Sequence, residues 1–256
     1  MSHLHIPDGV LPLWIVGAGW LLTAALLALA LRSHPATVGA RLPLLAVLSA
    51  FMLVAMSLHL VPIGYHVNLT VATGILLGPA LGFIAAFIVN LVLALFGHGG
   101  ITVAGLNTLV IGAEIALGYY LFRWFRSAMP GQVGPGVVAA LTTVVALALG
   151  SLLMIGIVGI SNVNPALNAP EATVVEPGGL SFRNPFGEGV LEWRPFAGEE
   201  RPEAQPTMDL ATFATLVLAL GAVGWIIEAF ITAIVVGYVA RMRPDLVPAP
   251  PRPRGG

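Results

Sequence analysis

The chain has 256 residues, of which 57% are hydrophobic and only 9% are charged. A soluble globular domain carries roughly 25% charged residues, so the composition excludes a soluble protein and indicates several membrane-spanning segments. The sequence contains neither Cys nor Lys, which excludes thiolate metal sites, a Walker-type phosphate loop and a lysine Schiff base. With 11 basic and 12 acidic residues the formal net charge is −1, and we expect no nucleic-acid partner.

The amino-terminal arm, MSHLHIPDG (residues 1–9), contains no Arg or Lys before the first apolar segment. A signal peptide has a positively charged amino-terminal region, so we expect this arm to remain on the mature protein. Pro7 and the turn-forming pair Asp8 and Gly9 could fold the arm back over the helices.

Five clear apolar segments follow, each long enough to cross a bilayer as a helix of about 20 residues. They are Val10–Leu31, Leu42–Leu60, Ile101–Phe122, Val137–Ile160 and Leu210–Ala240. Residues 66–96 form a further apolar stretch that contains Gly78 and Pro79. We predict that this stretch crosses twice, as short helices that turn at Gly78 and Pro79; a re-entrant segment is the alternative. The predicted fold is an all-α polytopic bundle of about seven transmembrane helices.

Arginines near the ends of membrane spans mark the cytoplasmic side. They lie in the loop after the first span, in the loop after Ile101–Phe122 and in the carboxy-terminal tail. The residues are Arg32, Arg41, Arg123, Arg126, Arg241, Arg243, Arg252 and Arg254. We therefore predict an outside N-terminus and a cytoplasmic C-terminus.

The chain divides into an arm, a membrane core, a loop, a last helix and a tail. The predicted boundaries are 1–9, 10–160, 161–208, 209–243 and 244–256. The segment 161–208 contains seven Pro, five Gly, seven Glu and three Arg, so we expect an extracellular loop with little regular structure. A solvated linker is the simpler interpretation, and a flap whose net charge of −4 attracts cations is the alternative.

Histidines gather at the predicted outer face, where five of the six lie: His3, His5, His59, His66 and His98. Each alone is explained by a hydrogen-bonded ring, but together they predict a metal site. Imidazole is the commonest protein metal ligand, and nitrogen ligands without thiolate suit Ni, Cu, Zn or Co.

The amino terminus could itself chelate a metal ion. A free α-amine, the following backbone amides and an imidazole two or three residues along can bind a divalent ion in one plane. Met1, Ser2 and His3 have the three-residue spacing, and removal of Met1 leaves the two-residue spacing. Square-planar nitrogen coordination favours Ni²⁺ or Cu²⁺; a frayed arm is the alternative.

Three motifs occur in order within residues 5–107: HIPDGVL, GILLGPALG and FGHGGITVAGLNTL. This stretch resembles the cobalt/nickel substrate-capture subunits of energy-coupling-factor (ECF) transporters, the CbiM/NikM family. The resemblance implies a multi-pass protein of a prokaryotic plasma membrane that captures Ni²⁺ or Co²⁺ as a substrate, without an organic cofactor. It also implies a transmembrane coupling subunit and two ATP-hydrolysing subunits as partners, with a small accessory membrane subunit as an optional one.

In that family the terminal amine, the second residue and a histidine at the start of the third helix hold the metal ion. By this resemblance the ligands correspond to His5 and His66. Because four residues precede His5 here, either His3 takes the chelating position and His5 becomes a further ligand, or the terminus is trimmed. The predicted ligands are His3, His5, His66 and the backbone of Ser2. Supporting candidates are His59, His98, Asn68, Asn107 and Asp8.

Two further readings remain open from the sequence. Glu114 and Glu228 lie within apolar spans, where ionisable groups indicate function, and a stand-alone divalent-cation permease could use them. An intramembrane metallohydrolase would need a general base beside the histidines, for which Asp8 is the candidate. The leading prediction is a transport subunit that is not itself an enzyme.

Overall fold

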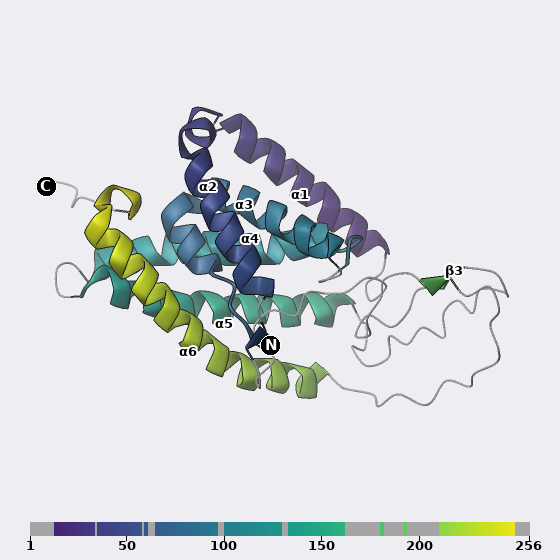
Figure 1. The fold of residues 1–256 in the computed structure, drawn as a ribbon. Helices are drawn as coiled ribbons and strands as arrows, with labels where there is room; N and C mark the ends of the chain where they lie inside the picture. The colour runs from purple at the N-terminus through teal and green to yellow at the C-terminus, as the bar shows by residue number, and fades with distance from the viewer. Residues whose placement is uncertain are drawn as a thin grey trace, which may run out of the picture.

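The computed structural model describes residues 13–33, 35–57, 59–60, 65–96, 100–129, 133–161, 180–181, 192–193 and 210–248. Within them, six helices are long and apolar enough to cross a membrane, which confirms the predicted all-α polytopic fold (Figure 1). They are α1 (Leu13–Ser33), α2 (Pro35–Ser57), α3 (Thr70–Leu95), α4 (Ala104–Ala128), α5 (Pro135–Ser161) and α6 (Leu210–Met242).

Short elements accompany the helices. Two antiparallel pairs of two-residue strands are described, β1 (His59–Leu60) with β2 (Tyr65–His66), and β3 (Leu180–Ser181) with β4 (Glu192–Trp193). A single 3-10 turn, η1 (Pro244–Leu246), follows α6. The pair β3–β4 belongs to the predicted loop 161–208, most of which lies outside the described residues.

The five clear apolar segments correspond to α1, α2, α4, α5 and α6, but α2 and α4 extend beyond them by more than one helical turn. Helix α2 begins at Pro35, seven residues before the apolar segment, because proline is well suited to the first turn of a helix. Helix α4 continues past Arg123 to Ala128, because arginine is a good helix former. Hydrophobicity therefore located these helices, and local propensity set their ends.

The stretch predicted to cross twice forms the single element α3, which is broken at Gly78. This residue has φ 78° and ψ 174°, a conformation that glycine adopts without the penalty of a Cβ atom. Side-chain positions at Gly74 and Gly82 both lie within 4 Å of Ile115, whereas about 12 Å separates such residues in a straight helix. The predicted turn is thus a sharp kink, and the predicted count of seven helices is not confirmed.

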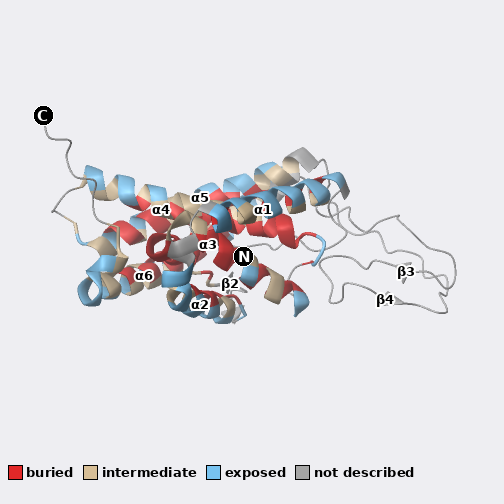
Figure 2. Ribbon diagram, turned by 90° about the horizontal axis from the view of Figure 1, so that it is seen from above, coloured by how far each residue is buried: buried red, intermediate tan, exposed pale blue. Residues whose placement is uncertain are grey.

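Helices α3 and α4 are the most buried of the six. Figure 2 shows buried residues concentrated along them, while pale exposed residues follow the outer sides of the bundle. The exposed positions include large apolar side chains, as expected for a lipid-facing surface. Examples are Leu21, Phe51, Ile226 and Phe230.

Close contact between α3 and α4 depends on a residue without a side chain. A Cβ atom at Gly74 would meet the backbone carbonyl oxygen of Ile115 and fall 3.2 Å from its Cα. Small residues at such positions let membrane helices approach closely. The beginning of α3 is therefore fixed against the backbone of α4.

We predict that Gly74→Ala destabilises the protein by about 1–3 kcal/mol, because the added methyl group forces α3 and α4 apart. The control is Gly17→Ala, since nothing lies within 4 Å of a Cβ atom at Gly17. Thermal unfolding of the two variants in detergent should show a lower midpoint for Gly74→Ala alone. Equal midpoints would contradict the close approach.

Candidate metal site at the start of α3

The sequence-predicted site residues divide into two groups. Those that lie outside the described residues are Ser2, His3, His5, Asp8 and His98. The backbone of His59 and His66 is described, and Asn68 and Asn107 are described in full. The described part of the candidate site therefore centres on the entry to α3.

Two of the candidate histidines are paired by the backbone. Strands β1 and β2 are antiparallel, and His59 is the register partner of His66. Directly opposite residues of an antiparallel pair have Cα atoms about 4.5–5.5 Å apart. The structure thus brings together the end of α2 and the start of α3 at two of the six histidines.

Leu69 stands between this strand pair and α3 in an unusual conformation. Its φ of 58° and ψ of 19° lie in the left-handed region, which is rare for a bulky side chain. Holding a residue other than glycine there costs about 1–3 kcal/mol, so the surrounding structure must impose it. Leu69 also occupies the N-cap of α3 without any side-chain capping hydrogen bond.

A glutamate from the last helix binds the N-cap residue itself. The amide N–H of Leu69 donates to Oε1 of Glu228 over 2.9 Å, across 159 residues of sequence. Glu228 is fully buried. Helix N-termini carry a partial positive charge, so a carboxyl oxygen suits this position. Helix α6 therefore holds the N-cap residue of α3.

A second glutamate holds the next residue. The hydroxyl of Thr70 donates to Oε2 of Glu114 over 3.3 Å, and both side chains are buried. The Glu114 carboxyl group packs against Gly150 of α5, where a Cβ atom would fall 2.8 Å from its Cδ. Because Gly150 leaves this space, Glu114 can bridge α3 and α5 from its place on α4.

Two polar residues at the entry to α3 are buried. Asn68 and Thr70 have no exposed surface, whereas Val67 and Leu69 are partly exposed. No three His, Asp or Glu side chains come together in the described ranges. The two glutamates therefore act on the backbone and hydroxyl of α3, and the sequence had singled them out without indicating their partners.

Asn107 lies in the first turn of α4, in a region held by α1. The indole N–H of Trp20 donates to the carbonyl oxygen of Thr102 over 2.6 Å, and the Thr23 hydroxyl donates to that of Gly105 over 2.7 Å. These contacts fix residues that follow the FGHGG sequence in the chain. They place the buried Asn107 on a rigid helix start.

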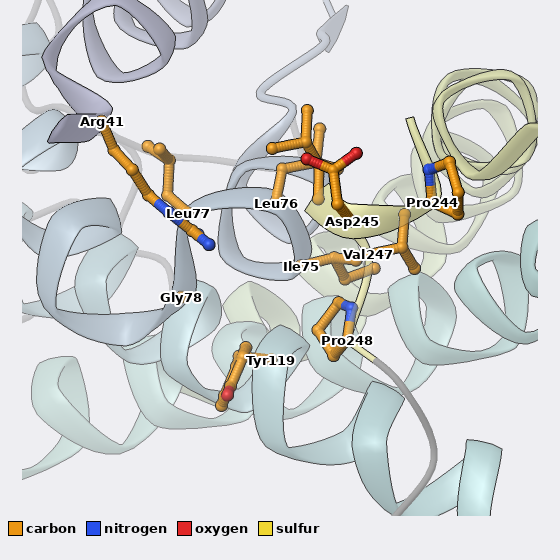
Figure 3. A pocket seen from close by; sticks show the side chains of 11 residues that line it. Arg41, Ile75, Leu76, Leu77, Gly78, Tyr119, Pro244, Asp245, Val247 and Pro248 are labelled. Atoms are coloured by element: carbon orange, nitrogen blue, oxygen red, sulfur yellow. The ribbon is translucent and has the colours of Figure 1, made fainter. Parts of the chain in front are cut away.

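The part of α3 before the kink, residues 70–77, has a cavity of about 360 Å³ at its end near Gly78 (Figure 3). Its lining includes Arg41 of α2, Gly78 at the kink, Tyr119 of α4 and Asp245. Asp245 accepts two hydrogen bonds from Arg243, of 3.0 and 2.9 Å. These hydrogen bonds are the main cause that lowers the pKa of Asp245 below its ordinary value. With its acid already paired and Arg41 in its wall, this cavity suits an anion better than a divalent cation.

Comparison with known proteins assigns nearly the whole chain to the cobalt-uptake family that the sequence motifs resemble. Residues 5–246 match the model of the family "Cobalt uptake substrate-specific transmembrane region" (CbiM). A protein of Haloquadratum walsbyi, whose name assigns it provisionally to metal transport, is 32% identical over 95% of this chain and 93% of its own. A similarly named protein of Methanocaldococcus jannaschii is 29% identical over 95% of this chain and 94% of its own.

Solved structures share the fold. A truncated transition metal transporter superposes with a TM-score of 0.67 at 22% identity, covering 93% of this chain and 99% of its own. A transition metal transporter gives the same TM-score at 21% identity, with 93% of each chain covered. With residues 5–246 matched, the chain belongs to the cobalt-uptake CbiM family, as a multi-pass membrane component of metal transport and not an enzyme in itself.

Proposed function

We propose that the chain is the metal-capture subunit of an ATP-driven ECF importer, with Ni²⁺ or Co²⁺ as its substrate. The observation that carries this proposal is the register pairing of His59 with His66 directly before the buried start of α3, in a chain that matches the cobalt-uptake family from residue 5 to residue 246. The metal ion enters from outside the cell and is held where the amino-terminal arm meets this strand pair.

The ligand set combines the arm with strand β2. The terminal amine, the Ser2 backbone and the His3 imidazole form the chelate, and His66 supplies the ligand from the strand that precedes α3. His5 is the next candidate. Histidines and polar groups that orient these ligands are His59, His98, Asn68, Asn107 and Asp8. Such supporting groups tune the affinity of a metal site.

Energy for uptake comes from other chains. A transmembrane coupling subunit and two ATP-hydrolysing subunits complete the importer, and a small accessory membrane subunit is an optional further component. The arrangement of the buried acids supports this assignment over a stand-alone permease. A permease needs polar groups spaced along a path through the membrane, whereas Glu114 and Glu228 contact the consecutive residues Thr70 and Leu69.

The central prediction concerns His66. Purified protein should bind about one Ni²⁺ or Co²⁺ per chain, and His66→Ala should lower the affinity at least tenfold because it removes a ligand. Isothermal titration with each ion measures this and also compares nickel with cobalt. The control is His34→Ala, since His34 lies between Arg32 and Arg41, in the loop that we predict to be cytoplasmic. An affinity unchanged by His66→Ala would remove this residue from the site.

A separate prediction concerns the amino terminus. Acetylation of the terminal amine, or extension of the chain beyond it, should lower the affinity about as much as His66→Ala, because the amine can no longer ligate. Mass spectrometry of the purified chain establishes whether Met1 is present. Comparison of His3→Ala with His5→Ala then identifies the chelating histidine. Tight binding by the acetylated protein would reject the amine chelate.

The transport class can be tested in vesicles. We expect radioactive ⁶³Ni²⁺ or ⁵⁷Co²⁺ uptake only when the chain is reconstituted with its coupling and ATP-hydrolysing subunits and ATP. Vesicles that contain the partner subunits without this chain are the control. Uptake by the chain alone, driven by an ion gradient, would favour the permease.

A further inference from the structure

The N-cap residue of α3, Leu69, is held by a hydrogen bond to a distant helix. Leu69 has no side-chain acceptor for a helix N–H group, and its left-handed backbone conformation is disfavoured. Its amide donates instead to Glu228 of α6. In a membrane each backbone polar group must be satisfied within the protein, and the Leu69 amide meets this need through the buried Glu228.

We infer that Glu228 is a positioning residue for His66. Only Val67 and Asn68 separate His66 from Leu69, so the conformation of Leu69 sets the direction in which the chain leaves the helix toward the histidine. Glu228 fixes that conformation by accepting the Leu69 amide hydrogen bond. The inference rests on the proposed function, because it assumes that His66 binds the metal ion.

Two features favour a positioning role for Glu228 over a general packing role. Its Oε1 lies 2.9 Å from the Leu69 nitrogen, which is ordinary geometry for a hydrogen bond. The first turn of α3 is then regular, with the Thr73 amide donating to the Leu69 carbonyl oxygen over 2.9 Å. At this end of α3 the irregularity is thus confined to Leu69, whose amide Glu228 holds.

Glu114 supports the entry to α3 at a different residue from the one that Glu228 binds. It accepts the hydrogen bond from Thr70 and packs against Gly150. The entry to α3 is therefore held from α4 and α6 at two successive residues. A ligand carried on a rigid, supported element loses less freedom on binding than one on a free loop.

The test compares two substitutions of Glu228 in the full-length chain. Glu228→Gln keeps an oxygen that accepts the Leu69 hydrogen bond, whereas Glu228→Leu keeps the volume and removes the acceptor. We expect Ni²⁺ and Co²⁺ affinity within about threefold of wild type for Glu228→Gln and about tenfold weaker for Glu228→Leu. The matched control is Thr232→Val, one turn along the same buried face of α6, with wild-type affinity.

A second readout does not depend on the metal ion. Hydrogen–deuterium exchange of the peptide containing Leu69, in metal-free protein, should be faster in Glu228→Leu and unchanged in Glu228→Gln. Should Glu228→Leu fail to purify as a monodisperse protein, Leu69→Val tests the same point with Glu228 intact. A β-branched residue at positive φ is strongly disfavoured, so we expect the same tenfold loss.

The outcomes separate the two proposals. Wild-type affinity in Glu228→Leu, with binding lost in His66→Ala, overturns the positioning role and leaves the capture function intact. Equal losses in Glu228→Gln and Glu228→Leu also overturn it, because the acceptor would then not matter. Absence of an effect in His66→Ala defeats the proposed ligand, whatever the exchange of the Leu69 peptide shows.

Discussion

The hydrogen bond from the Leu69 amide to Glu228 is the constraint on which the start of α3 depends. A helix that begins inside a membrane protein cannot leave its first N–H groups to water. A serine or threonine at the N-cap commonly accepts a hydrogen bond from the next N–H groups of the helix, but here the position is occupied by leucine. The Leu69 amide itself is held by α6, which links the last helix of the chain to the residues that follow His66.

This arrangement requires room for the acids, and glycines provide it. Gly150 leaves space on α5 for the carboxyl group of Glu114, and Gly74 lets α3 lie directly on the backbone of Ile115. A larger residue at either position would move the entry to α3 relative to α4 or α5. The small residues in the core are therefore part of what positions the candidate site, although none of them could bind a metal ion.

Much of the fold could be predicted because membrane spans are a local property of the sequence. Apolar runs located five helices, and Gly78 with Pro79 located the break in α3. The partners of Glu114 and Glu228 could not be predicted, because they depend on which helices pack together across as many as 159 residues. The left-handed Leu69 had no signal either, since nothing in its residue type favours that conformation. The amino-terminal ligands remain predictions from the sequence and the family resemblance.

The kink at Gly78 explains why the Leu69 amide needs a hydrogen-bond acceptor from within the protein. It limits the first limb of α3 to residues 70–77, about 12 Å of helix, which is less than half of a hydrocarbon core of about 30 Å. One end of this limb meets the cavity beside Arg41 and Tyr119, so the other end must lie within the protein. With leucine at the N-cap, the acceptor for the Leu69 amide comes from α6. The backbone that leads from His66 into α3 is therefore positioned by the last helix of the chain and not by a local cap.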